Sequence, residues 1–337
     1  MKFLGGVQTL RAWAALAVVV FHASSRAGDA ILVGQAGVDV FFVVSGFIMW
    51  VLSERSPAPR DFMRDRILRI TPLYWLATAA MVLGGLIGAF PNLVLSPPYI
   101  FASFLFLPHP SPNGDEIWPI LVQGWTLNYE MFFYALFALV LFARRASQLP
   151  LLLGAMLILV GAGRLFGAGN FVSAFYTDPI LLEFAAGVLI GAFWTRGVVP
   201  NAAVAAAMIL AGVAAYALQA VAPLEGERVV MYGAPAVLIV GGVVALERRG
   251  RMAVWPPLRF LGDASYSIYL FHTFAISVVG RLLGEMLPYW VETVVSTVAG
   301  ALAGVIVFVL IERPLMRYFK SRRDGTAKGI AAEGAAS

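Results

Sequence analysis

The sequence contains no cysteine and little charge, since Asp, Glu, Lys and Arg together make up 13% of its 337 residues. Without cysteine the chain has no disulfide, no thiolate metal site and no acyl-cysteine intermediate. Soluble domains carry about a quarter charged residues, so the low charge and a mean hydropathy of +0.83 exclude an ordinary soluble fold. The three histidines, His22, His109 and His272, form no HExxH or comparable spacing, and we expect no catalytic metal.

Apolar segments are what the chain has in abundance, with 60% hydrophobic residues. A helix needs about 20 apolar residues to cross a bilayer, so the sequence predicts an all-α polytopic membrane protein, a bundle of about ten transmembrane helices. These are expected near 7–24, 36–53, 71–90, 121–143, 150–166, 178–194, 200–221, 229–246, 264–283 and 291–311. The apolar segment 93–107 is short and contains Pro97-Pro98, so we interpret it as re-entrant or interfacial.

The distribution of Lys and Arg predicts the orientation. With the N-terminus inside, nineteen of the 24 lie in inner segments, and the outer loops hold Arg26, Arg164, Arg228 and Arg281. Because cytoplasmic loops are the basic ones, we expect both termini in the cytoplasm and attribute the pI near 9.6 to topology rather than to nucleic-acid binding. We expect one transmembrane domain, 1–321, and a disordered cytoplasmic tail, 322–337.

Two ionisable residues interrupt the first apolar segment. Arg11 and His22 are eleven residues apart, so at about 100° and 1.5 Å per residue they share one helix face, roughly 16 Å apart along the axis. An Arg at the bilayer centre costs about 2.5–3.5 kcal/mol and by default faces a polar cavity. The pair is therefore the first candidate for an active site.

Three carboxylates are expected near the level of His22. Asp39 lies about one turn into the second span, and Glu130 and Glu183 lie within about two turns of the outer boundary. A carboxylate that orients an imidazole fixes its tautomer, as general-base catalysis on a hydroxyl requires. We expect this arrangement of His22 and Asp39. Asp39 alternatively caps its helix, and hydrogen bonding between helices is an equal alternative for Glu130 and Glu183.

The sequence gives less indication of a catalytic role for the other two histidines. His272 lies in the middle of its span, where we expect helix packing. His109 follows Pro108 in a proline-rich outer loop, where contact with an acceptor and simple surface exposure are both open.

On the inner side, Arg66 and Arg69 lie three residues apart and share a helical face. Guanidinium groups bind phosphate through forked, charge-assisted hydrogen bonds, although topology alone explains most inner arginines. A phosphate-bearing donor inside and a general base outside would suit the transfer of an acyl group across the membrane.

These motifs together resemble the membrane-bound acyltransferase-3 family of bacteria, over nearly the whole chain. Each is weak alone, but six in the same order are specific. They are Arg11-x10-His22, the segment 37–47, Phe62-x3-Arg66-x2-Arg69 with Pro72, Trp125-Thr126-Leu127 with Glu130, the segment 265–272, and Glu312-Arg313-Pro314. The segment 124–133 is most similar to the exopolysaccharide acetyltransferases of the family.

The resemblance implies a multi-pass O-acyltransferase of the bacterial inner membrane. It would take acetyl, or a related acyl group, from cytoplasmic acyl-CoA to a sugar hydroxyl of a surface or exported polysaccharide. By the same resemblance His22 is the catalytic base, Arg11 contacts CoA or the transition state, and Arg66 and Arg69 hold the donor. We expect Asp39 and Glu130 to complete the catalytic set.

The route to the acceptor stays open at this point. Some members of the family carry an extracytoplasmic esterase-like domain, which we do not expect in this protein. Either a glycan or lipid-linked oligosaccharide enters the bundle directly, or an accessory protein relays the acyl group. The alternative function is a transporter or lipid-linked glycan flippase that uses the buried charges as a substrate or proton path.

Overall fold

The computed structural model describes residues 4–114, 116–167 and 169–321, and this part of the chain folds into helices and loops without a β-strand. The all-α prediction is confirmed, while the expected tail at 322–337 lies outside the described residues. The helices are α1 (Gly5–Ala27), α2 (Gly37–Ser53), α3 (Pro59–Leu86), α4 (Pro97–Phe104), α5 (Trp125–Val140), α6 (Arg145–Phe166), α7 (Phe171–Tyr176), α8 (Leu181–Thr195), α9 (Ala202–Val221), α10 (Ala234–Arg248), α11 (Pro256–Leu283) and α12 (Tyr289–Val307). Short 3-10 turns, η1 (Leu32–Ala36) and η2 (Val122–Gly124), precede α2 and α5, and π turns, η3 (Val229–Gly233) and η4 (Phe308–Glu312), precede α10 and follow α12.

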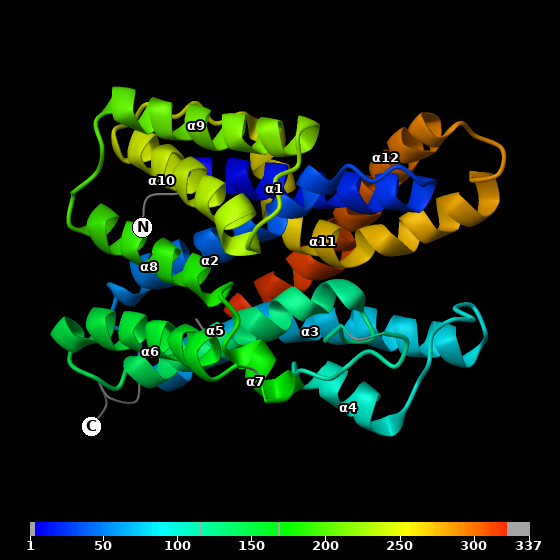
Figure 1. The fold of residues 1–337 in the computed structure, drawn as a ribbon, viewed down its shortest axis with the longest axis horizontal. Helices are drawn as coiled ribbons and strands as arrows, with labels where there is room; N and C mark the ends of the chain where they lie inside the picture. Colours follow the sequence, from blue (N-terminus) through cyan, green and yellow to red (C-terminus); the bar gives the residue numbers. More distant parts are fainter. Residues whose placement is uncertain (1–3, 115, 168, 322–337) are drawn as a thin grey trace.

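Nine helical segments of the described chain are long and apolar enough to cross a membrane. The expected span at 121–143 is α5, which has 16 residues and is shorter than that length. It nevertheless packs on α2, α3, α6 and α8 within the bundle (Figure 1). The first helix begins, and the helix that continues from α12 ends, in the left half of Figure 1.

Proline positions explain two local features. Proline in the first turn starts α3 and α4, where its missing N–H has no helical partner to lose. The helix expected from residue 71 therefore begins at Pro59, because apolar length marks the membrane crossing and not the end of the helix. Eight residues of α4 (Pro97–Phe104) are too few to cross a bilayer, which agrees with the interpretation of 93–107.

The second helix is the centre of the bundle and packs on α1, α5, α8 and α10. Glycines let α2 and α8 approach closely: a Cβ at Gly46 would lie 2.2 Å from the carbonyl oxygen of Phe184, and one at Gly187 would lie 2.1 Å from that of Val43. Small residues at such contacts are a common feature of membrane helices. This contact fixes Asp39 and Ser45 on α2 relative to Glu183 on α8.

Candidate active site

A polar-lined cavity lies between α1, α2, α3, α5 and α11, with an empty volume of about 880 Å³ that includes open space at its mouth. Its polar lining residues are Arg11, Ser45, Arg66, Arg69, Thr126, Glu130, Tyr134, Ser265, Tyr266 and Tyr269. Four residues expected from the sequence, Arg11, Arg66, Arg69 and Glu130, therefore share one cavity. We call it the central cavity.

Two of its guanidinium groups are unpaired. Arg11 and Arg66 are half-buried, and neither makes a hydrogen bond or ion pair with another described residue. The Nε atom of Arg66 is buried without a partner. Because an unpaired charge in a membrane is costly and marks a functional site by default, these two groups are available to an anionic ligand.

The third guanidinium is held in place. Arg69 donates to Oε1 of Glu312 at 2.6 Å, and Glu312 is 1% exposed. The other carboxylate oxygen of Glu312 accepts from the hydroxyl of Ser267 at 2.5 Å. Glu312 ends the π turn η4, and π turns inside helices occur frequently at functional sites. The C-terminal helix thus positions Arg69 at the edge of the cavity.

Glu130 carries the carboxylate of the cavity. Its Oε1 atom accepts from the hydroxyl of Ser45 at 2.8 Å and from that of Tyr134, while Oε2 has no partner among the described residues. Glu130 lies with the arginines, and not at the level of His22 as expected. The position of Glu130 within its expected helix indicated an approximate depth in the membrane, but it did not indicate which way the side chain points.

His22 is oriented by a backbone carbonyl. Its Nδ1 lies 3.0 Å from the carbonyl oxygen of Val18, and a carbonyl only accepts, so Nδ1 carries the proton and Nε2 has the free lone pair. This is the tautomer that a general base needs.

A second imidazole lies beside it. The ring of His272 is 5.0 Å from that of His22 between centroids. Its Nδ1 lies 2.9 Å from the carbonyl oxygen of Ile268, and its Nε2 is buried without a partner. Both histidines therefore present a free Nε2, a feature that the position of His272 in mid-span did not suggest.

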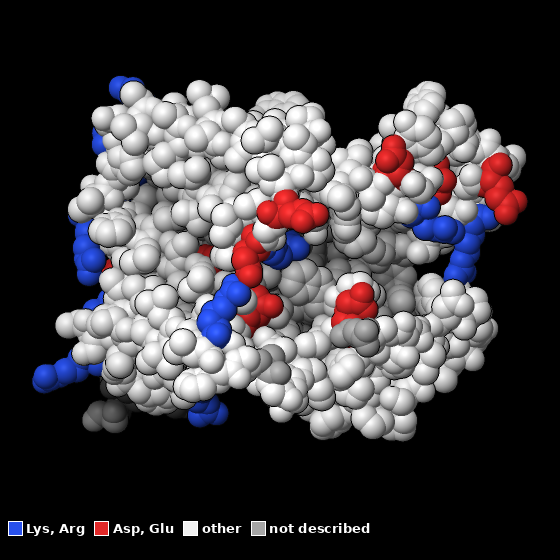
Figure 2. Space-filling view, in the orientation of Figure 1, with Lys and Arg blue, Asp and Glu red and all other residues white. Residues whose placement is uncertain are grey.

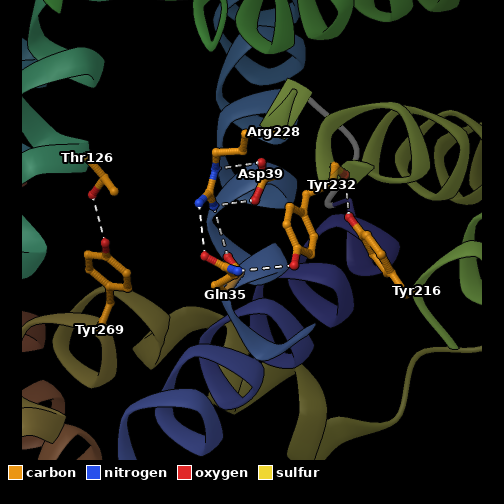
Figure 3. A network of polar contacts seen from close by, with 7 residues as sticks. All are labelled: Gln35, Asp39, Thr126, Tyr216, Arg228, Tyr232 and Tyr269. Carbon is orange, nitrogen blue, oxygen red and sulfur yellow. Dashed lines mark hydrogen bonds and ion pairs between the residues drawn. The ribbon is translucent and has the colours of Figure 1, made fainter. Parts of the chain in front are cut away.

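The predicted contact between Asp39 and His22 is wrong in this structure. Asp39 is fully buried and accepts two hydrogen bonds from Arg228, at 3.1 Å from Nε and 2.6 Å from Nη2 (Figure 3). A forked guanidinium is a stronger partner for a carboxylate than a neutral imidazole. Glu183 is also buried and lies near Asp39 and Arg228, but neither of its carboxylate oxygens has a hydrogen-bond partner among the described residues.

The Arg228 group extends further through side chains. Arg228 donates to both the side-chain and backbone oxygens of Gln35, at 3.2 and 3.3 Å. Gln35 in turn donates to the hydroxyl of Tyr232, and Tyr216 donates to the carbonyl of Tyr232 (Figure 3). Sequence reasoning missed this group, although Arg228 is one of the four cations expected in outer loops.

Tyr269 separates the central cavity from the histidines. Its hydroxyl lies 2.8 Å from that of Thr126 and donates to the carbonyl of Gln123 at 3.1 Å (Figure 3). Its ring is 6.3 Å from that of His272. His22 and Asp39 are not among the residues that line the cavity, so the structure brings the arginines and Glu130 together and leaves the imidazoles behind Tyr269.

His109 lies away from the central cavity and contacts residues near its own loop. Its ring lies 5.5 Å from that of Tyr99, and its Nδ1 is 2.7 Å from the carbonyl of Pro110. No cluster of three or more possible metal ligands of the His, Cys, Asp or Glu type occurs in the described part of the chain.

Comparison with known proteins identifies the family. A family model described as an acyltransferase domain matches residues 4–313. The exopolysaccharide production protein ExoZ of Rhizobium meliloti (strain 1021) is 47% identical over 309 residues, which cover 90% of this chain and 96% of ExoZ. The acyltransferase MdmB of Streptomyces mycarofaciens is 26% identical, with 93% of this chain and 92% of MdmB covered.

A more distant relative is longer. The peptidoglycan O-acetyltransferase OatA of Listeria monocytogenes serovar 1/2a is 23% identical, with 96% of this chain covered but 58% of OatA. We found no significant match among solved structures. The family model and the close similarity to ExoZ confirm what the six motifs predicted: this chain belongs to the membrane-bound acyltransferase-3 family.

Proposed function

We propose that this membrane acyltransferase transfers an acyl group, acetyl in the first instance, from cytoplasmic acyl-CoA to a sugar hydroxyl of a surface or exported polysaccharide. The observation that carries the proposal is the central cavity, in which Arg11 and Arg66 offer unpaired guanidinium groups to an anionic donor. The names of ExoZ and OatA, an exopolysaccharide production protein and an O-acetyltransferase, support the acceptor and the bond formed.

The donor enters from the basic side of the bundle, which we propose to be the cytoplasmic side of the bacterial inner membrane. Lys and Arg gather at the left of Figure 2, the end at which α1 begins in Figure 1. Basic loops face the cytoplasm in membrane proteins, and this assignment puts both termini there.

In the proposed reaction, the donor in the central cavity meets His22 on the other side of Tyr269. The Nε2 atom of His22 takes the proton of the acceptor hydroxyl while the hydroxyl oxygen attacks the thioester carbonyl. The tetrahedral intermediate collapses, the C–S bond breaks, and the CoA thiolate takes the proton back from the imidazolium. Arg11 stabilises negative charge that develops on the donor. The side chain of Tyr269 has to move aside, because it lies between the cavity and the histidines.

The proposal is tested by His22→Ala in purified protein reconstituted in lipid vesicles. Loss of a general base typically lowers the rate by about 10²–10⁴, so acetyl-CoA consumption with a polysaccharide acceptor should fall by that factor. His109→Ala is the matched control, because its ring lies against Tyr99 of α4 and Phe171 of α7 and not beside His272. Retained acylation in His22→Ala would contradict the role of His22, and acceptor movement without thioester loss in the wild type would point to transport.

A further inference from the structure

A second cavity opens beside Arg11 and Arg69, with an empty volume of about 660 Å³ that includes open space. We call it the basic mouth. Arg11 and Arg69 line both this mouth and the central cavity, so the two spaces meet there. The other charged residues that line it are Asp263, Arg313, Arg317 and Lys320. Five cations thus face one carboxylate.

The cations on the C-terminal helix have no partner in the part of the chain that the structure describes. Arg313, Arg317 and Lys320 are exposed, and none makes a hydrogen bond or ion pair with another described residue. Their spacing of four and three residues puts them on one helical face. Topology explains why basic residues lie on this side, but not why three of them line a mouth that shares Arg11 and Arg69 with the candidate active site.

The mouth is built on a rigid base. A Cβ at Gly262 would lie 2.1 Å from the carbonyl oxygen of Gln8, and one at Gly304 would lie 2.2 Å from the Cα of Ile268. These contacts press α11 against α1 and α12 against α11. Glu312, buried and bonded to Arg69, then fixes the helix one residue before Arg313. The cations are therefore presented by helices whose positions are set.

We propose that the basic mouth binds the phosphates at the nucleotide end of acyl-CoA and selects donors with a ribose 3′-phosphate. This inference rests on the proposed function. Arg69 and Arg313, nearest the central cavity, contact the diphosphate, and Arg317 and Lys320, up to about 10 Å further along the helix, contact the 3′-phosphate. The pantetheine arm then passes Arg11 into the central cavity. The donor carries about four negative charges at pH 7, and the mouth offsets most of them with a net charge of +3, since Asp263 and Glu312 neutralise two of its five cations.

The test compares three donors in vesicles of neutral lipid: acetyl-CoA, acetyl-dephospho-CoA and S-acetylpantetheine. We expect Arg317→Gln/Lys320→Gln to raise the KM for acetyl-CoA about 10- to 100-fold, because charge-assisted hydrogen bonds are lost. The kcat for acetyl-CoA should stay as in the wild type. The KM for acetyl-dephospho-CoA, which lacks the 3′-phosphate, should also stay unchanged. The matched control is Arg60→Gln/Arg64→Gln, which removes two exposed inner cations of α3 that line neither cavity.

A second measurement needs no variant. Adenosine 3′,5′-bisphosphate should compete with acetyl-CoA about tenfold better than adenosine 5′-monophosphate does. Equal inhibition by the two nucleotides, or an unchanged KM in the double variant, would overturn the inference while leaving the proposed function intact. The inference is also overturned if the variant affects activity only in vesicles with anionic lipid, since the cations would then bind headgroups. Absence of thioester consumption by the wild type would overturn the proposed function itself.

Discussion

Two buried ion pairs, one toward each end of the bundle, have similar geometry and different surroundings. Asp39 pairs with Arg228 beside the π turn η3, and Glu312 pairs with Arg69 at the end of the π turn η4. Both carboxylates are at most 1% exposed, and both guanidinium groups are about 30% exposed. The two pairs differ in what lies next to them.

At the end that the proposed orientation makes the outer one, Arg228 lies near two carboxyl groups, Asp39 and Glu183, and its remaining donors bind Gln35; we call these residues the outer group. At the opposite end, Arg69 shares a cavity with Arg11 and Arg66, which have no partner in the described chain; we call these three arginines the inner group. A buried charge without its partner destabilises a fold. The charge of Arg228 is therefore paired within the protein, although both carboxylate oxygens of Glu183 stay buried without a hydrogen-bond partner among the described residues, whereas the inner group has positive charge left for a ligand.

The largest effect on stability is expected from Arg228→Met. This change leaves Asp39 and Glu183 buried without their cation, which typically costs about 3–5 kcal/mol. The yield of monodisperse protein and its melting temperature should fall sharply. Arg11→Met should leave both nearly unchanged, because Arg11 has no hydrogen-bond or ion-pair partner among the residues that the structure describes. Arg228→Met/Asp39→Asn should recover part of the loss, and equal melting temperatures for the two single variants would break the comparison.

Activity should show the opposite order. Arg11→Gln removes a charge that acts on the donor, and loss of one such group commonly lowers kcat by about 10²–10³, while the fold remains. Arg11→Lys should recover activity only in part, because an ammonium lacks the forked geometry of guanidinium. The control on the same helix is Arg26→Gln, an exposed arginine in the last turn of α1. Normal kcat in Arg11→Gln would contradict the role of the inner group.

The inner group was predictable from the sequence. Arg11 interrupts an apolar helix, and placing its charge in a membrane costs free energy that a functional role would explain. Arg66 and Arg69 share a helical face. All three are therefore candidates from the sequence alone. The helical spans followed from apolar length. The helix ends were less accurate, because α3 continues beyond the membrane crossing to Pro59.

The outer group was not predictable in the same way. Arg228 is 189 residues from Asp39 in the sequence, and a single arginine in an outer loop gives no sign of its partner. His272 was assigned to packing because depth alone was known. Which helices are neighbours decides both pairings, and one sequence contains little information on that point.

A smaller effect is expected at the boundary between the two regions. Tyr269→Phe removes the hydrogen bonds to Thr126 and to the carbonyl of Gln123, each worth about 0.5–1.5 kcal/mol. We expect transfer to change within about tenfold and acetyl-CoA hydrolysis without acceptor to rise, because the cavity opens more easily. Thr126→Val should have the same effect. A loss of transfer beyond about 100-fold in Tyr269→Phe alone would mean that the hydroxyl takes part in the reaction.

The smallest effect is expected from Glu227→Gln, which tests whether any charge near Arg228 matters or only the buried pair. Glu227 is the residue before Arg228, but it pairs with Arg164 at 2.7 Å with both side chains 53% exposed. Exposed pairs contribute little, because water and salt screen them. Melting temperature and kcat should therefore match the wild type. If Glu227→Gln lowered the melting temperature as far as Arg228→Met does, the loop as a whole, and not burial of Asp39, would hold the outer end together.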